Sequence, residues 1–388
     1  MRDGRNQEAR RPALVSSGLD IVVKKDTPLY GVKDQVLKVP PYTLRTYDAK
    51  VKLNQNENPY DFPADLKQET FRRFMARTWS RYPEFVPDSL RAQLSEYAGW
   101  SKDGILVGNG SNELLLATMM ILVRDRTPVV MPSPTFQVYG LVSQILCARI
   151  TAVPFTASLE YDVDALLSRA DEAGAKVLIL CSPNNPTGTE LPGGGLRRIL
   201  EHFRGHILLD EAYYEFSGQT GLQYLEHFPR LVITRTFSKA MGMAGLRLGY
   251  LMAHPDLASQ ISKAKLPYNI NQFSLTAAQV ALENRSRFRP AIEAILSERE
   301  RLRQMLGAVP GVKVYPTGAN FFLFEISAPP RAVFEELHQQ GILIRDVSSY
   351  PMLSRCLRVT VGTPEENDRF IVALQEIMGR LPALEVRR

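Results

Sequence analysis

The stretch that decides the fold of this chain is Leu231-Val232-Ile233-Thr234-Arg235-Thr236-Phe237-Ser238-Lys239-Ala240, and Arg247 follows Lys239 by eight residues. The apolar start of this stretch predicts a buried strand, which places Lys239 just past a strand end. A lysine amine held in a protein interior can lose its proton and condense with an aldehyde. The adjacent hydroxyls and Arg247 could hold a phosphate. A lysine after a strand is more often a solvated helix-start residue, so the interpretation depends on its neighbours.

A carboxylate and a tyrosine end the preceding predicted strand, in Ile207-Leu208-Leu209-Asp210-Glu211-Ala212-Tyr213. Pyridoxal 5'-phosphate (PLP) supplies the aldehyde that a lysine can bind, and its ring nitrogen needs an acidic partner because the protonated ring is the electron sink. Asp210 fits that role. A helix N-cap aspartate is the alternative, but Lys239 at the tip of the following strand favours the PLP site.

Two further turns follow predicted strands. Val177 to Gly188 ends in Ser182-Pro183-Asn184-Asn185-Pro186-Thr187-Gly188, a proline-stiffened turn in which Asn185 can present its amide to the ring O3' of PLP. Gly104 to Leu116 predicts a strand, a glycine loop and a helix start, and a helix N-terminus binds phosphate. A dinucleotide fingerprint fails there, because Glu113 replaces the third glycine and the next strand lacks the ribose-binding acid.

These four segments, in this order and with Arg358 near the end, resemble the fold-type-I PLP-dependent aminotransferases over roughly residues 50 to 380. More narrowly, the chain is similar to the histidinol-phosphate aminotransferase branch in Leu53-Asn54-Gln55-Asn56-Glu57-Asn58-Pro59, Arg81-Tyr82-Pro83-Glu84, Ser182 to Gly188, Asp210 to Tyr213 and Cys356 to Asn367. The resemblance implies an α/β fold with a large domain, built on a mostly parallel, helix-covered sheet, and a smaller α+β domain. Relatives that act on aromatic amino acids, and a threonine-phosphate decarboxylase, share much of this set.

The resemblance also implies which residues bind the cofactor. Lys239 would form the Schiff base and then carry the proton, Asp210 would pair with the pyridine nitrogen, and Asn185 with Tyr213 would hydrogen-bond O3'. The ring would stack on Phe136, and the phosphate would be held by Ser111, Asn112, Thr236, Ser238 and Arg247, with Tyr82 reaching across from a partner subunit. A complete site would therefore require a homodimer.

For the substrate, the resemblance implies that Arg358 clamps the anionic end, that Arg345 is a second anion contact and that Asn58 also binds the substrate. Alternatives stay open: core packing for Phe136, an aromatic surface position for Tyr82, and a structural salt bridge to Asp346 for Arg345. The chain departs from the family at Tyr60-Asp61-Phe62-Pro63, where a glycine, a proline and a serine are usual. Asp61 would add charge, and Phe62 bulk, near the mouth of the site.

Periodicity gives the expected organisation. Seven strand-like runs alternate with helical patterns, which predicts a parallel sheet with its binding loops at the carboxyl ends of the strands. The runs are Ile105 to Val107, Val129 to Met131, Arg149 to Val153, Val177 to Leu180, Ile207 to Leu209, Leu231 to Thr234 and Gly249 to Met252. The smaller layer is predicted to contain a long helix from Ala277 and a second helix at Arg331 to Gln339. Its expected strands are Val312 to Tyr315, Phe321 to Phe324, Ile342 to Ile344 and Leu357 to Val361. A capping box at Thr363 to Glu366 begins the last helix. We expect a partly mobile N-terminal arm over 1–48, a large PLP-binding domain over 49–285 and a small domain over 286–388.

Composition excludes several classes of partner. The net charge of +6 is modest and its arginines are dispersed, so no nucleic-acid partner is implied, although an anionic substrate would be attracted. Three cysteines without a CxxC pair suggest reduced thiols in a cytoplasmic protein. The five histidines lack zinc spacing, so we expect no metal, and no apolar run approaches the length of a membrane span.

The expected function is PLP-dependent transamination of L-histidinol phosphate with 2-oxoglutarate, giving imidazole acetol phosphate and glutamate. An aromatic or broad-specificity amino-acid aminotransferase would use the same residues. A PLP-dependent phospho-amino-acid decarboxylase would differ in reaction class, and only its product would separate it. A non-catalytic PLP-fold binding protein is disfavoured because lysine, aspartate, asparagine and tyrosine are all present.

Overall fold

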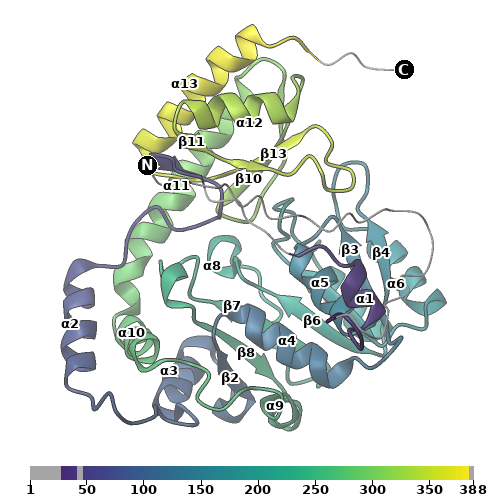
Figure 1. The fold of residues 1–388 in the computed structure, drawn as a ribbon, viewed down its shortest axis with the longest axis vertical. Coiled ribbons are helices and arrows are strands. Elements are labelled where there is room, and N and C mark those ends of the chain that lie inside the picture. The colour runs from purple at the N-terminus through teal and green to yellow at the C-terminus, as the bar shows by residue number, and fades with distance from the viewer. Residues whose placement is uncertain (1–27, 42–46, 384–388) are drawn as a thin grey trace, which may run out of the picture. The chain divides into compact units, whose positions relative to one another are not determined.

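The computed structural model describes residues 28–41 and 47–383 (Figure 1). Met1–Pro40 and Pro41–Arg388 are two separate units. The described part of the first unit contains one short helix, α1 (Asp34–Lys38). Most of the predicted N-terminal arm, including the basic segment at its start, lies outside the described residues.

The larger sheet of the second unit has seven strands among the described residues, in the order β2-β8-β7-β6-β5-β3-β4. Their bounds are β2 Ile105–Gly108, β3 Pro128–Ser133, β4 Arg149–Pro154, β5 Val177–Cys181, β6 His206–Asp210, β7 Leu231–Thr236 and β8 Gly249–Ala253. The five strands from β7 to β4 are parallel, and β8 is antiparallel to both of its neighbours. The predicted mostly parallel sheet is confirmed.

Helices cover both faces of this sheet (Figure 1). Alternate residues of β5 show the division, since Leu178 and Leu180 pack in one apolar cluster while Val177 and Ile179 pack in another. The first cluster includes side chains of α2 (Ala64–Met75), α3 (Asp88–Ala98), α6 (Val163–Glu172), α7 (Gly195–His202) and α10 (Gln272–Glu283), and the second those of α4 (Ser111–Leu122), α5 (Gln137–Ile145) and α9 (Pro255–Ser262). Strands buried on both faces need continuous apolar runs, which explains why these strands were recognisable in the sequence.

A smaller antiparallel sheet, in the order β12-β13-β10-β9, forms the second layer. Its strands are β9 Val312–Val314, β10 Phe321–Ile326, β12 Arg345–Asp346 and β13 Cys356–Thr360. It packs with α11 (Arg289–Gly307), α12 (Pro330–Gln339) and α13 (Pro364–Arg380), and β1 (Val51–Lys52) pairs with β11 (Ile342–Leu343) in the same apolar cluster. The expected α+β layer is thus present, and the residues just before Asn54 pack with it. The proposed boundary near residue 285 falls in the turn between α10 and α11 and stays a prediction.

Two expected elements of this layer differ from the structure. The long helix predicted from Ala277 is two helices, because α10 ends at Glu283 and α11 begins only at Arg289, with proline in its first turn. Proline has no amide hydrogen to donate within a helix and is tolerated only at such a start. The strand predicted at Ile342 to Ile344 is β11, which ends one residue earlier, at Leu343. The next strand, β12, begins at Arg345 and belongs to a different sheet. The predicted capping box at Thr363 is confirmed, with Glu366 as its partner.

Among residues 28–41 and 47–383, no helix has the length and apolar character needed to cross a bilayer.

Candidate active site

A cavity of about 470 Å³ lies where the loops after the large-sheet strands face the smaller sheet. All but two of the residues predicted to form the site line it: Ser111, Asn112, Phe136, Asn185, Asp210, Tyr213, Thr236, Ser238, Lys239, Arg247, Arg345 and Arg358. Parallel strands end at one edge of a sheet, so turns that are far apart in the sequence meet there. The tertiary structure therefore brings the predicted set together.

Lys239 stands at the end of the turn that follows β7. The Thr236 hydroxyl accepts a hydrogen bond from the Ser238 amide at 3.1 Å, which fixes this turn. The Lys239 amine donates to the Gln55 carbonyl at 2.9 Å. Burial, reinforced by the positive charge of Arg358, lowers the pKa of Lys239 from 10.5 to about 7. A neutral, nucleophilic amine is thereby available near physiological pH.

Asp210 ends β6 and is buried at the cavity wall. The Tyr139 hydroxyl donates to its Oδ2 at 2.6 Å, and the Ala212 amide donates to its Oδ1 at 3.0 Å. Burial raises the pKa of Asp210, and the Tyr139 hydrogen bond opposes that rise. The sequence interpretation missed Tyr139. Its spacing of three residues from Phe136, at the start of α5, was the available signal, because residues three apart share a helix face.

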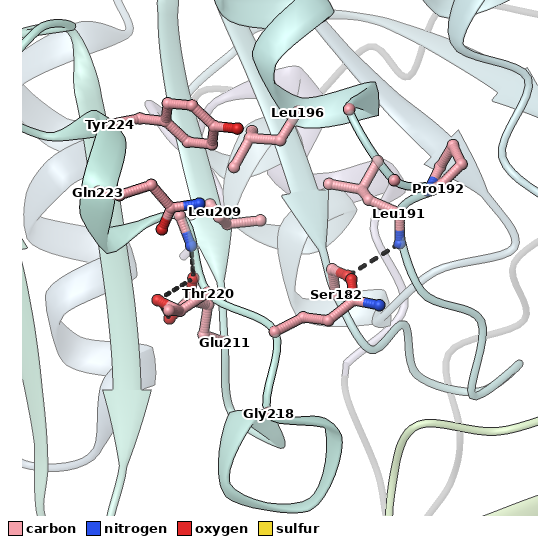
Figure 2. A pocket seen from close by; sticks show the side chains of 14 residues that line it. Ser182, Leu191, Pro192, Leu196, Leu209, Glu211, Gly218, Thr220, Gln223 and Tyr224 are labelled. Atoms are coloured by element: carbon pink, nitrogen blue, oxygen red, sulfur yellow. Dashed lines mark hydrogen bonds between the residues drawn. The ribbon is translucent and has the colours of Figure 1, made fainter.

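Glu211, the next residue, points to the opposite side and away from this cavity. Figure 2 shows it in a second cavity, of about 350 Å³, with Ser182, Leu191 and Tyr224. Glu211 is 1% exposed, forms an ion pair with Arg235 at 2.8 Å, and accepts hydrogen bonds from Thr220 and the Gly221 amide. Both of its carboxylate oxygens are engaged, so it holds this part of the fold in place while Asp210 faces the candidate site.

A phosphate cradle is formed where α4 begins. Gly110 has φ +78°, and a Cβ atom there would lie 2.5 Å from Nη2 of Arg247. Glycine therefore allows the guanidinium to approach the free amides at Ser111. The Arg247 Nη1 also donates to the Ser238 hydroxyl at 3.3 Å. Helix amides, hydroxyls and a guanidinium converge here, which is the donor set that a phosphate dianion requires.

Asn185 and Tyr213 are two possible hydrogen-bond donors that line the cavity. Arg358, on β13, donates from Nη1 to the Asn185 Oδ1 at 2.5 Å and from Nη2 to the Asn54 carbonyl at 2.7 Å. Since the Asn185 oxygen is occupied, its NH₂ group is the end left for a bound molecule. Tyr213 accepts a hydrogen bond from Asn56 Nδ2 at 2.9 Å. Burial raises the pKa of Tyr213, and Arg358 opposes this.

One wall of the cavity is formed by Asn54, Gln55 and Asn56. These residues belong to a segment that carried the family resemblance, but none of them was predicted to form the site. These residues contact Arg358, Lys239 and Tyr213 in turn. The Asn54 Oδ1 is buried and has no hydrogen-bond partner within the described part of the chain. Such an acceptor on a cavity wall fits a bound molecule that supplies a donor.

Two predicted residues lie outside the cavity. Asn58 lines a neighbouring pocket, where its Nδ2 donates to the Ala240 carbonyl at 3.0 Å. Tyr82 is 79% exposed and stacks on Tyr268 with ring centroids 4.4 Å apart. A substrate contact for Asn58 and a contact across subunits for Tyr82 stay predictions.

The chain departs from the family at residues 60–63, and the expectation for Phe62 in this segment was wrong. Phe62 is buried in the apolar core against Phe288, at 5.2 Å between ring centroids, and adds no bulk to the mouth of the site. Asp61 is exposed and forms an ion pair with Lys67. Within the smaller layer, Asp346 accepts hydrogen bonds from Ser348, while Arg345 lines the cavity.

Throughout the described ranges, no group of three His, Cys, Asp or Glu side chains is placed to hold a metal ion.

Comparison with known proteins identifies the family. Residues 48–374 match the aminotransferase class I and II family. The chain belongs to this family. Histidinol-phosphate aminotransferases from Chlorobaculum tepidum and Chlorobium phaeovibrioides are 36% and 37% identical to it, each over 85% of this chain and over 95% and 92% of the relative. A Sinorhizobium meliloti histidinol-phosphate aminotransferase, solved with pyridoxal-5'-phosphate, superposes with a TM-score of 0.77 at 24% identity, covering 86% of this chain and 92% of its own.

The predicted family, the fold-type-I architecture and the PLP-dependent aminotransferase activity are thereby confirmed. The residues of the cavity fit this cofactor by their chemistry: an amine of lowered pKa, a buried carboxylate, two donors for a ring oxygen and a phosphate cradle.

Proposed function

We propose that this aminotransferase transfers the amino group of L-histidinol phosphate to 2-oxoglutarate, giving imidazole acetol phosphate and glutamate, in histidine biosynthesis. The observation that carries the choice of substrate is the pairing of Arg345 with Arg358. The two are direct partners in the register of β12 and β13, and both line the cavity. Directly opposed like charges on paired strands destabilise a sheet, so this arrangement suits an anionic substrate. The names of the relatives that share over a third of the sequence support the same substrate.

The cofactor would be held by residues of both layers. PLP, when bound, supplies an aldehyde for Lys239 and an electron sink for the reacting amine. We assign Asp210 to the ring nitrogen, where its charge would keep a proton in place, with Phe136 against the ring. Asn185 and Tyr213 would donate to the ring oxygen. The phosphate would lie in the cradle of Ser111, Asn112, Thr236, Ser238 and Arg247.

Lys239 would also move the substrate's proton. Its amine has a pKa of about 7 in the free chain, because burial and Arg358 disfavour its charged form. A base with a pKa near the working pH is well matched to accept and return a proton. Arg358 would orient the substrate by its anionic end and, through its hydrogen bond to Asn185, act on both substrate and cofactor.

The proposal is tested by competition among amino donors. Histidinol phosphate and phenylalanine are offered together with 2-oxoglutarate as the acceptor, and the oxo product of each donor is quantified. Histidinol phosphate should react with the higher kcat/KM. Arg345→Gln should reduce kcat/KM for it by about tenfold to a hundredfold, since a charge-assisted hydrogen bond is worth about 1.5–3 kcal/mol, and should reduce that for phenylalanine less.

Arg331→Gln is the matched control, because it makes the same change on the exposed surface of α12. It should leave both donors unaffected. A preference for phenylalanine, or equal losses for the two donors in Arg345→Gln, would assign the chain to the aromatic aminotransferases. Release of carbon dioxide from a phospho-amino acid without amino transfer would assign it to the decarboxylases.

We also infer that the protein is a homodimer. Tyr82 lies in an exposed aromatic group with Phe85 and Tyr268. Leu116 and Met120, one turn apart on α4, are also exposed and follow Asn112 of the cavity at helical spacing. Exposed apolar groups of this kind mark protein interfaces. Lys239→Ala and Tyr82→Ala chains, coexpressed, should form mixed dimers with one complete site and show more activity than either variant alone.

Localisation is inferred from the cysteines. Cys181 and Cys356 are buried, free thiols. Free thiols are typical of a reducing compartment, which supports a cytoplasmic enzyme.

A further inference from the structure

Asn56 connects three parts of the active site through one buried side chain. It is 1% exposed and has φ +54°. Its amide nitrogen Nδ2 donates to the Tyr213 hydroxyl at 2.9 Å. Its Oδ1 accepts from the Thr360 hydroxyl at 3.3 Å, and its backbone N–H donates to the same hydroxyl at 3.0 Å.

The Asn56 amide lies between Thr360 and Tyr213. The Thr360 hydroxyl accepts the Asn56 backbone N–H and donates its own proton to Oδ1. The oxygen of the amide thus faces Thr360, and the NH₂ group faces Tyr213. Because an NH₂ group can only donate, the phenol oxygen of Tyr213 must act as the acceptor in this contact. The single proton of the phenol is then not used towards Asn56.

We propose that Asn56 is a positioning residue that directs the Tyr213 hydroxyl proton into the cavity, where it is donated to an anionic oxygen of the bound molecule. The inference rests on the proposed function, in which that oxygen belongs to the ring of PLP. Asn185 is oriented in a parallel way, since Arg358 occupies its oxygen. The orientation of each donor, Tyr213 or Asn185, is thus set by a neighbouring protein side chain and not by the cofactor.

The backbone narrows the choice of residue at this position. A positive φ is adopted readily by glycine, and among other residues mostly by asparagine and aspartate. Of these three, only asparagine has a side chain that can donate to Tyr213. Asn56 therefore satisfies a conformational and a hydrogen-bonding requirement together.

Thr360 connects Asn56 to β13, the strand that carries Arg358. It lies two residues after Arg358 on β13, and its backbone N–H donates to the Leu53 carbonyl at 2.9 Å. The strand that places the substrate-binding arginine thus also holds Asn56.

The test compares the effect of Tyr213→Phe in three backgrounds: wild type, Asn56→Asp and Asn56→Gly. Asn56→Asp keeps the shape but replaces the donor by an acceptor, which would attract the phenol proton away from the cavity. Asn56→Gly removes the side chain and keeps the positive φ. The readout is the apparent pKa of the lysine-bound cofactor, from the visible absorbance of PLP-loaded protein as the pH is varied.

A donor to the ring oxygen stabilises its negative charge and so weakens the hold of the neighbouring lysine-linked nitrogen on its proton. In the wild-type background, Tyr213→Phe should therefore raise the apparent pKa by about one unit. In the Asn56→Asp background the rise should be less than about a third as large. The direct effect of the aspartate charge on the apparent pKa cancels, because Tyr213→Phe is compared with Tyr213 in the same background. In the Asn56→Gly background the rise should be intermediate, since the hydroxyl is no longer held by a neighbour.

Equal rises in all three backgrounds would overturn the proposal. Urea unfolding of the PLP-free variants separates loss of structure from loss of orientation, and if Asn56→Asp does not fold, an undiminished rise in Asn56→Gly would itself refute the role. Failure of the proposed function is distinguishable. Wild-type protein would then show no lysine-bound absorbance band, or would show the band and fail to transaminate histidinol phosphate, whatever residue stands at position 56.

Discussion

Lys239, the residue that we assign to PLP, is expected to destabilise the fold when PLP is absent. Lys239 must place an amine in a buried position near the positive charge of Arg358, and its pKa falls from 10.5 to about 7 as a result. Replacing it by methionine keeps the length of the side chain and removes the amine. Lys239→Met should therefore abolish transamination and stabilise the cofactor-free chain.

The magnitude follows from the shift in pKa. A fall from 10.5 to about 7 is about 3.5 units, and each unit corresponds to about 1.4 kcal/mol, so the unfavourable term is at most about 5 kcal/mol. The hydrogen bond from Lys239 to the Gln55 carbonyl offsets about 1 kcal/mol of it. Water in the cavity screens the charge further. We expect a net gain of about 2–3 kcal/mol in Lys239→Met below pH 7.

The gain should depend on pH with a definite sign. Below about pH 7 the lysine is charged in both the folded and the unfolded chain, and the whole penalty applies. Between about 7 and 10.5 only the unfolded chain binds the proton, so the stability of the wild type rises with pH. Between about pH 7 and about pH 9 this rise amounts to about 3 kcal/mol, so the advantage of Lys239→Met should largely disappear between about pH 6 and about pH 9.

Urea unfolding of PLP-free protein at these two pH values measures the effect. Lys176→Met is the matched control, because Lys176 is exposed, and it should show no comparable gain at either pH. The reasoning is refuted if Lys239→Met is less stable than the wild type at about pH 6, or if its advantage does not change with pH.

Three further substitutions test separate parts of the site. Asp210→Asn should retain PLP yet lower the transamination rate about a thousandfold, because the charge that keeps the ring nitrogen protonated is lost; single-turnover kinetics measure this. Arg235→Leu should cost about 3–5 kcal/mol in urea unfolding, because it leaves the buried Glu211 carboxylate without its partner. Gly110→Ala should weaken PLP binding about tenfold or more in equilibrium dialysis, since the new methyl group would displace Arg247 from the cradle.

Some features of this protein could be predicted because their signals are local. The strand before Lys239 is a continuous apolar run, the loop before Ser111 contains the glycine that the turn requires, and Thr363 begins a capping box. Each of these signals lies within about a dozen residues of sequence. The chemical type of each side chain then indicated which of these turns would meet at a cofactor.

Other features arose only from the tertiary structure. Asn56 and Thr360 are 304 residues apart, and their contact depends on how β13 approaches the segment after β1. Whether Phe62 enters the core or the mouth of the site depends on its packing against Phe288, which no local pattern encodes.

The sequence by itself indicated which residues would gather at one site, because a lysine, a carboxylate and a glycine loop at strand ends have few other uses in combination. Sheet register and packing decided how those residues are oriented. The opposed pair Arg345 and Arg358 exists because β12 and β13 align at that register. Tyr139 serves Asp210 because α5 packs against the face of the sheet to which that carboxylate belongs. Such relations depend on contacts between distant segments, which form only when the whole chain has folded.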